Sequence, residues 1–343
     1  QGVEPIDVSG YTNMISAGWG HTAVIKEDGT VWAWGYNSWG GLGDGTFDWS
    51  YIPVQSIGLD KAVSVATGEF HTVVLQQDGT VWVYGNDGIR DTEYHDMNAP
   101  IQEELENILD ISAKMFDTVI LKDNHTVWKF TEHGWYKVDN LDNIIKVSVG
   151  NYYGTALRKD GTVWAWGSNY NGQLGNGTKN DSDIPVKVSG LNDVVAITCG
   201  ASHAAALKED GTVWTWGSNY WGQLGNGTNS DSDIPVKVKE LNDIVAISAG
   251  GTQTIALKRD GTVWVWGDNS NGQLGDGTNN DSNIPVKVVG LTNVVAISAG
   301  DRHAIALKND GTVWAWGSNY WGQLGSGISK SSNIPVKALI KLW

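Results

Sequence analysis

The stretch "GTVWAWGSNYWGQLG", residues 311–325, holds three tryptophans within eight positions and stands between glycines. Close copies occupy residues 161–175, 211–225 and 261–275, and weaker copies begin at Gly29, Gly79 and His125. The first tryptophans of the copies are Trp32, Trp82, Trp128, Trp164, Trp214, Trp264 and Trp314. Four of the intervals between them are 50 residues, and the other two are 46 and 36. A period of this size indicates a solenoid or a propeller, so we expect one array of seven units over residues 1–343.

Each repeat has the pattern of four short strands. In residues 235–285 the segments "PVKV", "IVAISAG", "TIALK" and "VWVWG" are strand-like, "RDGT" is an Asp-Gly hairpin turn, and a long Gly/Asn/Asp loop follows. Seven such units predict an all-β, seven-bladed β-propeller with four antiparallel strands per blade, blade three being truncated. We expect "PVKA" (335–338) to complete blade seven and "PIDV" (5–8) to dock beside it as a clasp. The predicted blade cores are about 12–58, 62–104, 108–139, 144–189, 194–239, 244–289 and 294–339.

The composition agrees with this fold and narrows the classes of partner. The chain has 44 glycines and only 18% charged residues, which is typical of an all-β protein with many tight turns. The formal net charge of −15, without a basic cluster, disfavours nucleic acid. No apolar run approaches the ~18 residues of a membrane span. Cys199 is the single cysteine, so no intrachain disulfide can form, and we expect a small buried thiol in a monomer.

The three tryptophans of a repeat are expected to have two different roles. Side chains alternate along a strand, so Trp314 and Trp316 point to the same face and should be buried between blades. Trp321 follows the strand, in a loop, and its counterparts are Trp39, Asn171, Trp221 and Asn271. A core position would not tolerate asparagine, so the third tryptophan should face solvent.

The repeated histidines are candidates for chemistry that we assign to the scaffold. His21, His71, His203 and His303 occupy the same place in four repeats, and Asp117, Tyr153 and Gln253 fill it in the others. A catalytic histidine is normally one specific residue with one specific partner, so a repeated one should instead bond across blade junctions near the channel. No nucleophile elbow, P-loop or metal-ligand spacing is present, and we expect no catalytic residue, no metal and no cofactor. Calcium in the Asn/Asp loops stays open, although no full calcium-loop pattern is matched.

The submotifs together resemble the regulator of chromosome condensation repeat family. They are "ISAGWGHTAVI" (15–25), "ITCGASHAAAL" (197–207) and "ISAGDRHAIAL" (297–307), each followed by "DGTVWxWG" and then by "GQLG" or "GGLG". The resemblance covers nearly the whole chain and implies a seven-bladed propeller that serves as a binding platform. Its best-known eukaryotic member is an exchange factor for the GTPase Ran, which touches chromatin through a basic tail, whereas "QGVEPIDVSG" here is acidic. Bacterial relatives include a secreted propeller that inhibits β-lactamases through an aromatic-rich face, and this chain looks similar to that type.

The repeats disagree mainly in the two loops of each blade that share one rim. The residue pair before the histidine position is Trp19-Gly20, Glu69-Phe70, Met115-Phe116 and Asn151-Tyr152 in blades one to four. In blades five to seven it is Ala201-Ser202, Gly251-Thr252 and Asp301-Arg302. Every early blade therefore carries an aromatic residue there and no late blade does. Either this rim binds a partner, or older repeats have drifted and the rings plug the channel mouth.

We predict a partner-binding crescent on this rim. Its members are Trp19, Phe70, Phe116 and Tyr152, extended on the surrounding loops by Trp39, Trp49, Trp135 and Tyr136. The expected function is non-enzymatic recognition of a protein partner. One such partner would be an enzyme that the propeller inhibits. We expect the protein to act outside the cell or on its surface. Carbohydrate binding is the alternative, since Trp and Tyr beside Asn and Asp also suit sugar stacking. Hydrolysis has no supporting constellation.

Overall fold

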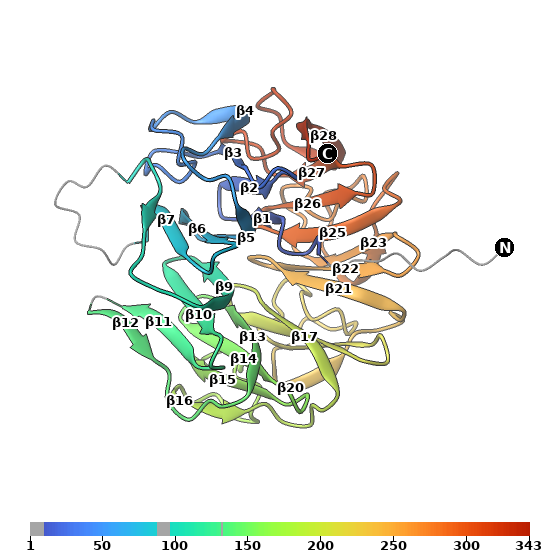
Figure 1. The fold of residues 1–343 in the computed structure, drawn as a ribbon. Coiled ribbons are helices and arrows are strands. Elements are labelled where there is room, and N and C mark those ends of the chain that lie inside the picture. The colour runs from blue at the N-terminus through green and yellow to red at the C-terminus, as the bar shows by residue number, and fades with distance from the viewer. Residues whose placement is uncertain (1–9, 88–96, 132) are drawn as a thin grey trace.

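The computed structural model describes residues 10–87, 97–131 and 133–343, which form a ring of seven four-stranded sheets (Figure 1). Each sheet uses four strands that are consecutive in the chain, and neighbouring strands are antiparallel. The predicted seven-bladed propeller is confirmed. The described residues contain no helix, and therefore none that could cross a membrane.

Blades one to three contain the first twelve strands. They are β1 (Ile15–Ala17), β2 (His21–Ile25), β3 (Val31–Gly35) and β4 (Ser50–Gln55); β5 (Ala62–Thr67), β6 (Phe70–Gln76), β7 (Val81–Asn86) and β8 (Ile101–Gln102); and β9 (Ile108–Lys114), β10 (Asp117–Lys122), β11 (Val127–Thr131) and β12 (Gly134–Lys137). Blade three is short because only residues 132–133 separate β11 from β12, where the other blades have a long loop.

Blades four to seven contain the other sixteen strands. They are β13 (Ile144–Val149), β14 (Tyr153–Arg158), β15 (Val163–Gly167) and β16 (Ser182–Lys187); β17 (Val194–Cys199), β18 (His203–Lys208), β19 (Val213–Gly217) and β20 (Ser232–Lys237); β21 (Ile244–Ala249), β22 (Gln253–Lys258), β23 (Val263–Gly267) and β24 (Ser282–Lys287); and β25 (Val294–Ala299), β26 (His303–Lys308), β27 (Thr312–Gly317) and β28 (Ser332–Lys341).

The Asp-Gly-Thr turns close the second hairpin of the blades. In blade one, Oδ1 of Asp28 accepts hydrogen bonds from the backbone nitrogen of Thr30 at 3.0 Å and from its hydroxyl at 2.6 Å. Gly29 between them has a φ of 80°, which glycine adopts without a steric cost. Asp78, Asp160, Asp210, Asp260 and Asp310 repeat this arrangement, and the hydrogen bonds from threonine contribute to lowering the pKa of each carboxyl.

The hydrophobic core is divided among the junctions between blades. Seven clusters of buried side chains are found in the described residues, one for each junction, including the junction between blades seven and one. The second tryptophan of the repeat is the largest buried side chain in several of them, as Trp316 is between blades six and seven. Full burial of such a ring stabilises the fold by roughly 2–3 kcal/mol by area.

The "GQLG" motif is the receptor for this buried tryptophan. The Nε1–H of Trp316 donates to the backbone carbonyl of Gln273 at 2.9 Å, and Trp216 and Trp266 make the same bond to Gln173 and Gln223. A Cβ on Gly275 would come within 2.8 Å of the Trp316 ring, so a side chain there would displace the indole. The motif of one blade therefore fits the tryptophan of the next blade.

The first tryptophan of the pair is less buried than predicted. Trp314 is only half-buried, although we expected both rings to be buried between blades. Its Nε1–H donates to the hydroxyl of Thr312 at 3.1 Å, and the Lys308 ammonium lies 5.8 Å from its ring centroid. The two rings share a face of the strand, but Trp314 lies next to the exposed hairpin turn, where solvent reaches it.

Within the described residues, the ring closes by packing of blade seven on blade one, and no sheet contains strands of both blades. Strand β28 completes blade seven, as predicted for residues 335–338. The Trp34 ring of blade one packs with Ile305 and Leu307 of blade seven, and its Nε1–H donates to the carbonyl of Gln323 at 2.8 Å. The predicted clasp, residues 5–8, lies outside the described residues. Cys199 is a buried free thiol, as expected, and burial raises its pKa.

Candidate partner-binding face

A ring of side-chain hydrogen bonds surrounds the channel beneath the candidate face. The Nε2 atoms of His21, His71, His203 and His303 each lie 2.9 Å from a threonine hydroxyl of the following blade, on Thr72, Thr118, Thr254 and Thr22. All four histidines are fully buried. They therefore join blades, in agreement with the scaffold role predicted from their repetition.

The threonine fixes the tautomer of the histidine, and burial keeps the ring neutral. The hydroxyl of Thr254 donates to the carbonyl of Gln223 at 2.9 Å, so it is available as an acceptor for an Nε2–H of His203. A Cβ on Gly200 would collide with the His203 imidazole, which accounts for the glycine three positions before each histidine. Burial lowers the pKa of His203 to about 3, and it does the same for His21 and His303, so these rings are neutral near pH 7.

The three blades without histidine make the same kind of link with other side chains. Asp117 accepts from the backbone nitrogen of Tyr152 at 3.0 Å, and Gln253 donates to the carbonyl of Gly300 at 3.0 Å. The hydroxyl of Tyr153 donates to the carbonyl of Gly200 at 3.1 Å. The position always bonds to the next blade, which explains why its residue type varies.

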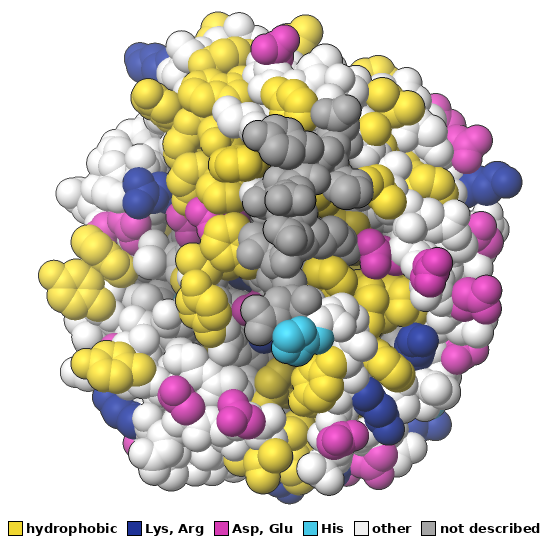
Figure 2. Space-filling view, turned by 90° about the vertical axis from the view of Figure 1, so that its left-hand side faces the viewer, with side chains coloured by type: hydrophobic (Ala, Val, Ile, Leu, Met, Phe, Trp, Pro, Cys, Tyr) yellow, Lys and Arg dark blue, Asp and Glu magenta, His cyan; other side chains and the backbone are white. Residues whose placement is uncertain are grey.

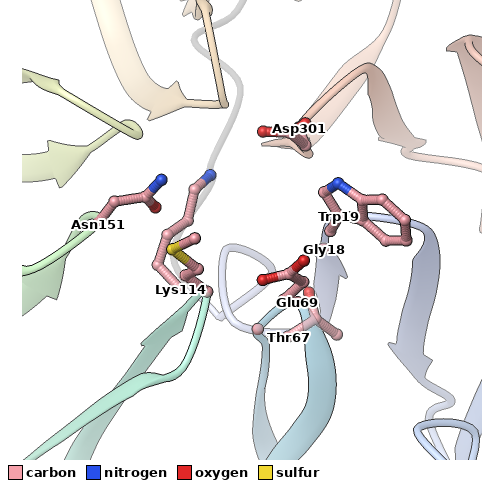
Figure 3. A pocket seen from close by; sticks show the side chains of 9 residues that line it. Gly18, Trp19, Thr67, Glu69, Lys114, Asn151 and Asp301 are labelled. Carbon is pink, nitrogen blue, oxygen red and sulfur yellow. The ribbon is translucent and has the colours of Figure 1, made fainter. Parts of the chain in front are cut away.

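The residue pairs before this position meet at the channel mouth. Backbone bonds between successive blades hold their loops together, such as Glu69 N to Met115 O at 2.8 Å and Asp301 N to Gly18 O at 3.0 Å. The first residue of the pair lines a cavity of about 200 Å³ in blades one, two, three, four and seven (Figure 3). These residues are Trp19, Glu69, Met115, Asn151 and Asp301.

Three of the nine residues that line the cavity are charged. Figure 3 shows the carboxylates of Glu69 and Asp301 and the amine of Lys114, at the end of β9, turned toward a common space. Burial raises the pKa of both carboxyls, and the pKa of Glu69 is raised further by Asp301. Burial also lowers the pKa of Lys114, which Asp301 partly offsets. The sequence comparison missed this group because it counted only aromatic residues.

Beside the cavity, eight aromatic side chains form one continuous group. Neighbouring ring centroids lie 4.2 to 6.5 Å apart, and all pairs but the closest fall in the range of about 4.5–7 Å that is typical of favourable aromatic pairs. We call this group the aromatic cluster; its members are Trp19, Tyr36, Trp39, Trp49, Phe70, Phe116, Tyr320 and Trp321. Each ring is half-buried or exposed. Figure 2 shows hydrophobic side chains gathered over part of one side of the molecule.

The cluster forms because the third tryptophan of one blade reaches the following blade. Trp321 of blade seven lies over Trp19 of blade one, with ring centroids 4.2 Å apart. A Cβ on Gly20 would lie 3.0 Å from the Trp321 ring, so the glycine of this pair leaves room for the stack. Trp39 of blade one lies 6.4 Å from Phe70 of blade two in the same way.

The structure brings together five of the eight predicted binding residues. Trp19, Phe70, Phe116, Trp39 and Trp49 belong to the aromatic cluster. Tyr152 is 60% exposed, but among the described residues it contacts no other ring of the cluster. Trp135 lies elsewhere: it packs between blades two and three, against Phe130, and its Nε1–H donates to Glu103 at 3.0 Å. Tyr136 follows it on β12, so the predicted extension over blade three is not part of the cluster.

Three members of the cluster were not predicted as binding residues. Tyr36, Tyr320 and Trp321 come from the end of β3 and from the long loop of blade seven. The sequence predicts that Trp321 faces solvent but leaves it out of the predicted crescent, because blade seven carries Asp301-Arg302 before the histidine position. The signal that could have found it is ring closure, which makes blade seven the neighbour of blade one. Aligning the repeats by position compares equivalent residues of different blades, but it does not show that Trp321 of blade seven lies beside Trp19 of blade one.

The fold and this face define a closed propeller with a differentiated rim. The chain belongs to the family of RCC1-like domains, whose family profile matches residues 134–341. Two profiles of the regulator of chromosome condensation (RCC1) repeat match residues 28–75 and 15–40.

Known proteins agree with this assignment. The chain is 30% identical to the ultraviolet-B receptor UVR8 of Arabidopsis thaliana over 198 residues, which cover 50% of this chain and 44% of UVR8. Prp20p of Saccharomyces cerevisiae has a similar structure, with a TM-score of 0.83 at 20% identity over 99% of this chain and 91% of that one. Human WBSCR16 gives a TM-score of 0.80 at 23% identity over 91% and 94% of the two chains. At these identities the structural likeness establishes the fold.

Proposed function

We propose that this chain is a non-enzymatic binding protein that recognises a protein partner through the aromatic cluster. The observation that carries the proposal is the continuity of eight accessible rings on a rim whose scaffold is otherwise repeated. Aromatic rings supply large contact area at a low entropic cost, and interface residues that dominate affinity are enriched in Trp and Tyr. The rings remain accessible on one rim of the closed ring of blades, which suits docking of a large partner.

Relatives support a protein as the partner. Yeast RCC1 (Prp20) has been solved bound to Kap60, and the binding of Prp20p to Gsp1p and histones has been described. Each of these partners is a protein, and Prp20 has the same fold as this chain. The acidic charge of the present chain favours a partner with a basic surface, since charge complementarity raises the association rate.

The buried histidines support a non-enzymatic role. His21, His203 and His303 have no solvent exposure, and each already bonds to a threonine across a blade junction. A general base must come within hydrogen-bond reach of a substrate proton, which these rings cannot do in the folded ring. The Asn side chains of the long loops are also in use: Asn169 bonds the backbone of Leu174, Thr178 and Asn180.

Two finer points remain predictions. One is that the partner is an enzyme that this chain inhibits, and the other is that the protein acts outside the cell or on its surface. Both rest only on the resemblance, inferred from the sequence motifs, to a secreted propeller that inhibits β-lactamases. An inhibition assay with the captured partner, if it is an enzyme, tests the first. Fractionation of the producing cells tests the second.

A capture experiment with matched variants tests the proposed function. The wild-type chain, a Trp19→Ala/Phe70→Ala double variant and Trp221→Ala are immobilised, and bound proteins are identified by mass spectrometry. Trp221 is the matched control because it occupies the same loop position as Trp321 but lies in blade five, and its ring contact is with Tyr220. We expect the wild type and Trp221→Ala to capture the same protein and the double variant to lose it. Equal capture by all three would overturn the proposal.

A second arm of the same experiment distinguishes carbohydrate recognition from recognition of a protein partner. A glycan array is probed with the wild type and the double variant. Binding of a glycan that the double variant loses, without any protein captured, would replace the protein-partner proposal by the lectin-like one.

A further inference from the structure

The cavity at the channel mouth is a site of limited size. Its volume is about 200 Å³, and its walls come from blades one, two, three, four and seven (Figure 3). Sites for small molecules and cofactors usually measure about 300–1,000 Å³. A single side chain suits this cavity better than a cofactor does. It also opens on the rim that carries Trp19 of the aromatic cluster.

The carboxylate of Glu69 lacks a partner on one side. Its Oε2 atom is shielded from solvent and accepts no hydrogen bond from any described residue. A buried polar atom without a partner costs free energy unless a ligand or another group supplies the hydrogen bond. The missing partner must be a donor, because a carboxylate oxygen is an acceptor.

Asp301 adds a second negative charge to the same space. Its closest cation in the described residues is the adjacent Arg302, whose Nε lies 3.7 Å away and whose side chain is 61% exposed. Two carboxylates that face the same cavity repel one another, and a cation bound between them would relieve this repulsion. The raised pKa of Glu69, caused by burial and then by Asp301, agrees with this arrangement.

Lys114 is the cation that the cavity already contains. Figure 3 shows its amine between Asn151 and Asp301. Within residues 10–87, 97–131 and 133–343, Lys114 makes no ion pair of 4.0 Å or shorter. The charged lining residues therefore carry two negative charges and one positive charge, which leaves the cavity with a net negative charge.

We propose that the cavity receives an arginine guanidinium from the protein partner, which donates to Glu69 and Asp301 beside the indole of Trp19. The proposal rests on the proposed function and names the chemistry of the partner's central contact. Arginine is favoured over lysine because its planar guanidinium has five donors and can serve two carboxylates at once. An indole wall adds a favourable cation–π contact.

Small probes test the cavity without the partner. N-acetyl-arginine methylamide, its citrulline analogue and N-acetyl-glutamate methylamide are titrated into the full chain, and binding is followed by calorimetry. We expect saturable binding of the arginine probe, with the uncharged citrulline probe weaker by about tenfold or more, because a charge-assisted bond is lost. Preference for the glutamate probe, which Lys114 would bind, or no binding of the arginine probe would overturn the proposal.

Three variants assign the binding to the named groups. Glu69→Gln should weaken the arginine probe by about tenfold, whereas Lys114→Met should strengthen it several-fold by removing a like charge. The control Glu209→Gln, next to an Asp-Gly-Thr turn and exposed, should change nothing. A melting curve for each variant confirms that it is folded. Unchanged affinity in Glu69→Gln would contradict the assignment.

The two proposals fail in different ways. If the arginine probe does not bind but capture of the partner still depends on Trp19 and Phe70, only the arginine site is wrong. If the probe binds as expected but the double variant captures the partner normally, only the role of the aromatic cluster is wrong.

Discussion

Blades one and five have the same scaffold and different rims. Trp34 and Trp216 are both fully buried and both donate to a glutamine carbonyl of the preceding blade. At the rim, however, blade one carries Trp19-Gly20 and blade five carries Ala201-Ser202. The long loop of the neighbouring blade also differs: blade seven places Trp321 beside blade one, whereas blade four has Asn171 at the equivalent position beside blade five. The groups that hold the ring together are thus separate from those that distinguish its two halves, so stability and binding should respond to different substitutions.

The largest effect should come from the buried tryptophan of the scaffold. Trp316→Ala removes a ring that contacts a core cluster and a bond to Gln273, and should cost about 3–5 kcal/mol of unfolding free energy. Trp314→Ala should cost less, about 1–2 kcal/mol, because that ring is half-buried. Denaturant unfolding of the two variants measures the difference. Equal losses would show that half-burial does not lower the contribution of Trp314.

The junction histidines should come next. His203→Ala should cost about 1–3 kcal/mol, since Thr254 loses its donor and a cavity remains. His203→Gln should cost less, because Gln253 fills the same position in blade six and bonds to the next blade. Chemical denaturation at pH 7 gives both values. Loss of partner binding by His203→Gln at intact stability would argue against a scaffold role.

Acid should weaken the same junctions. The pKa of His21, His203 and His303 is about 3 in the folded chain and 6.5 in the unfolded chain, so the unfolded state binds more protons between these values. Stability is therefore lost as the pH falls below 6.5, by about 1.4 kcal/mol per pH unit for each histidine.

The matched variant isolates this contribution. Glu69 and Asp301, whose pKa is raised by burial, act in the opposite sense, and they are equal in both chains. Between pH 6.5 and 4.5, the free energy of unfolding of His203→Gln should fall less steeply than that of the wild type. The difference in slope should equal the contribution of one histidine, about 1.4 kcal/mol per pH unit. Parallel pH profiles would show that His203 is not buried in neutral form.

The smallest effect on stability should come from the rim. Trp19→Ala removes ring contacts within the aromatic cluster. It should lower the free energy of unfolding by about 1 kcal/mol or less, because the ring is half-buried and no core cluster contains it. Trp135→Ala is the informative contrast. Its bond to Glu103 and its position between blades predict a larger loss of stability than for Trp19→Ala. A thermal melt of each variant measures this.

The repeats made the architecture predictable from the sequence, because each copy carries its own turn, strand and receptor signals. The blade count, the strand count and the junction role of the histidines followed from spacing and repetition alone. The half-burial of Trp314 did not, since alternation along a strand predicts the face of a side chain and not its distance from the rim. Trp135 was misplaced because blade three lacks the long loop, so the residues after its third strand form β12 instead of a rim loop.

The site was predictable only in part, because its decisive contacts cross blade boundaries. Comparison of equivalent positions identified Trp19, Phe70 and Phe116, which are neighbours in consecutive blades. Trp321 and Tyr320 lie about 300 residues from Trp19 in the sequence and reach it through ring closure. The charges of Glu69, Lys114 and Asp301 also come from three blades and form one cavity only in the closed ring.

The most direct test of the central claim is the affinity of the captured partner for two single variants. The dissociation constant is measured by calorimetry for Trp19→Ala and for Trp221→Ala against the wild type. The account predicts a loss of about 1–3 kcal/mol, roughly fivefold to more than a hundredfold, for Trp19→Ala and no change for Trp221→Ala. Unchanged binding of Trp19→Ala, or an equal loss in both variants, would contradict the claim that the aromatic cluster is the partner-binding surface.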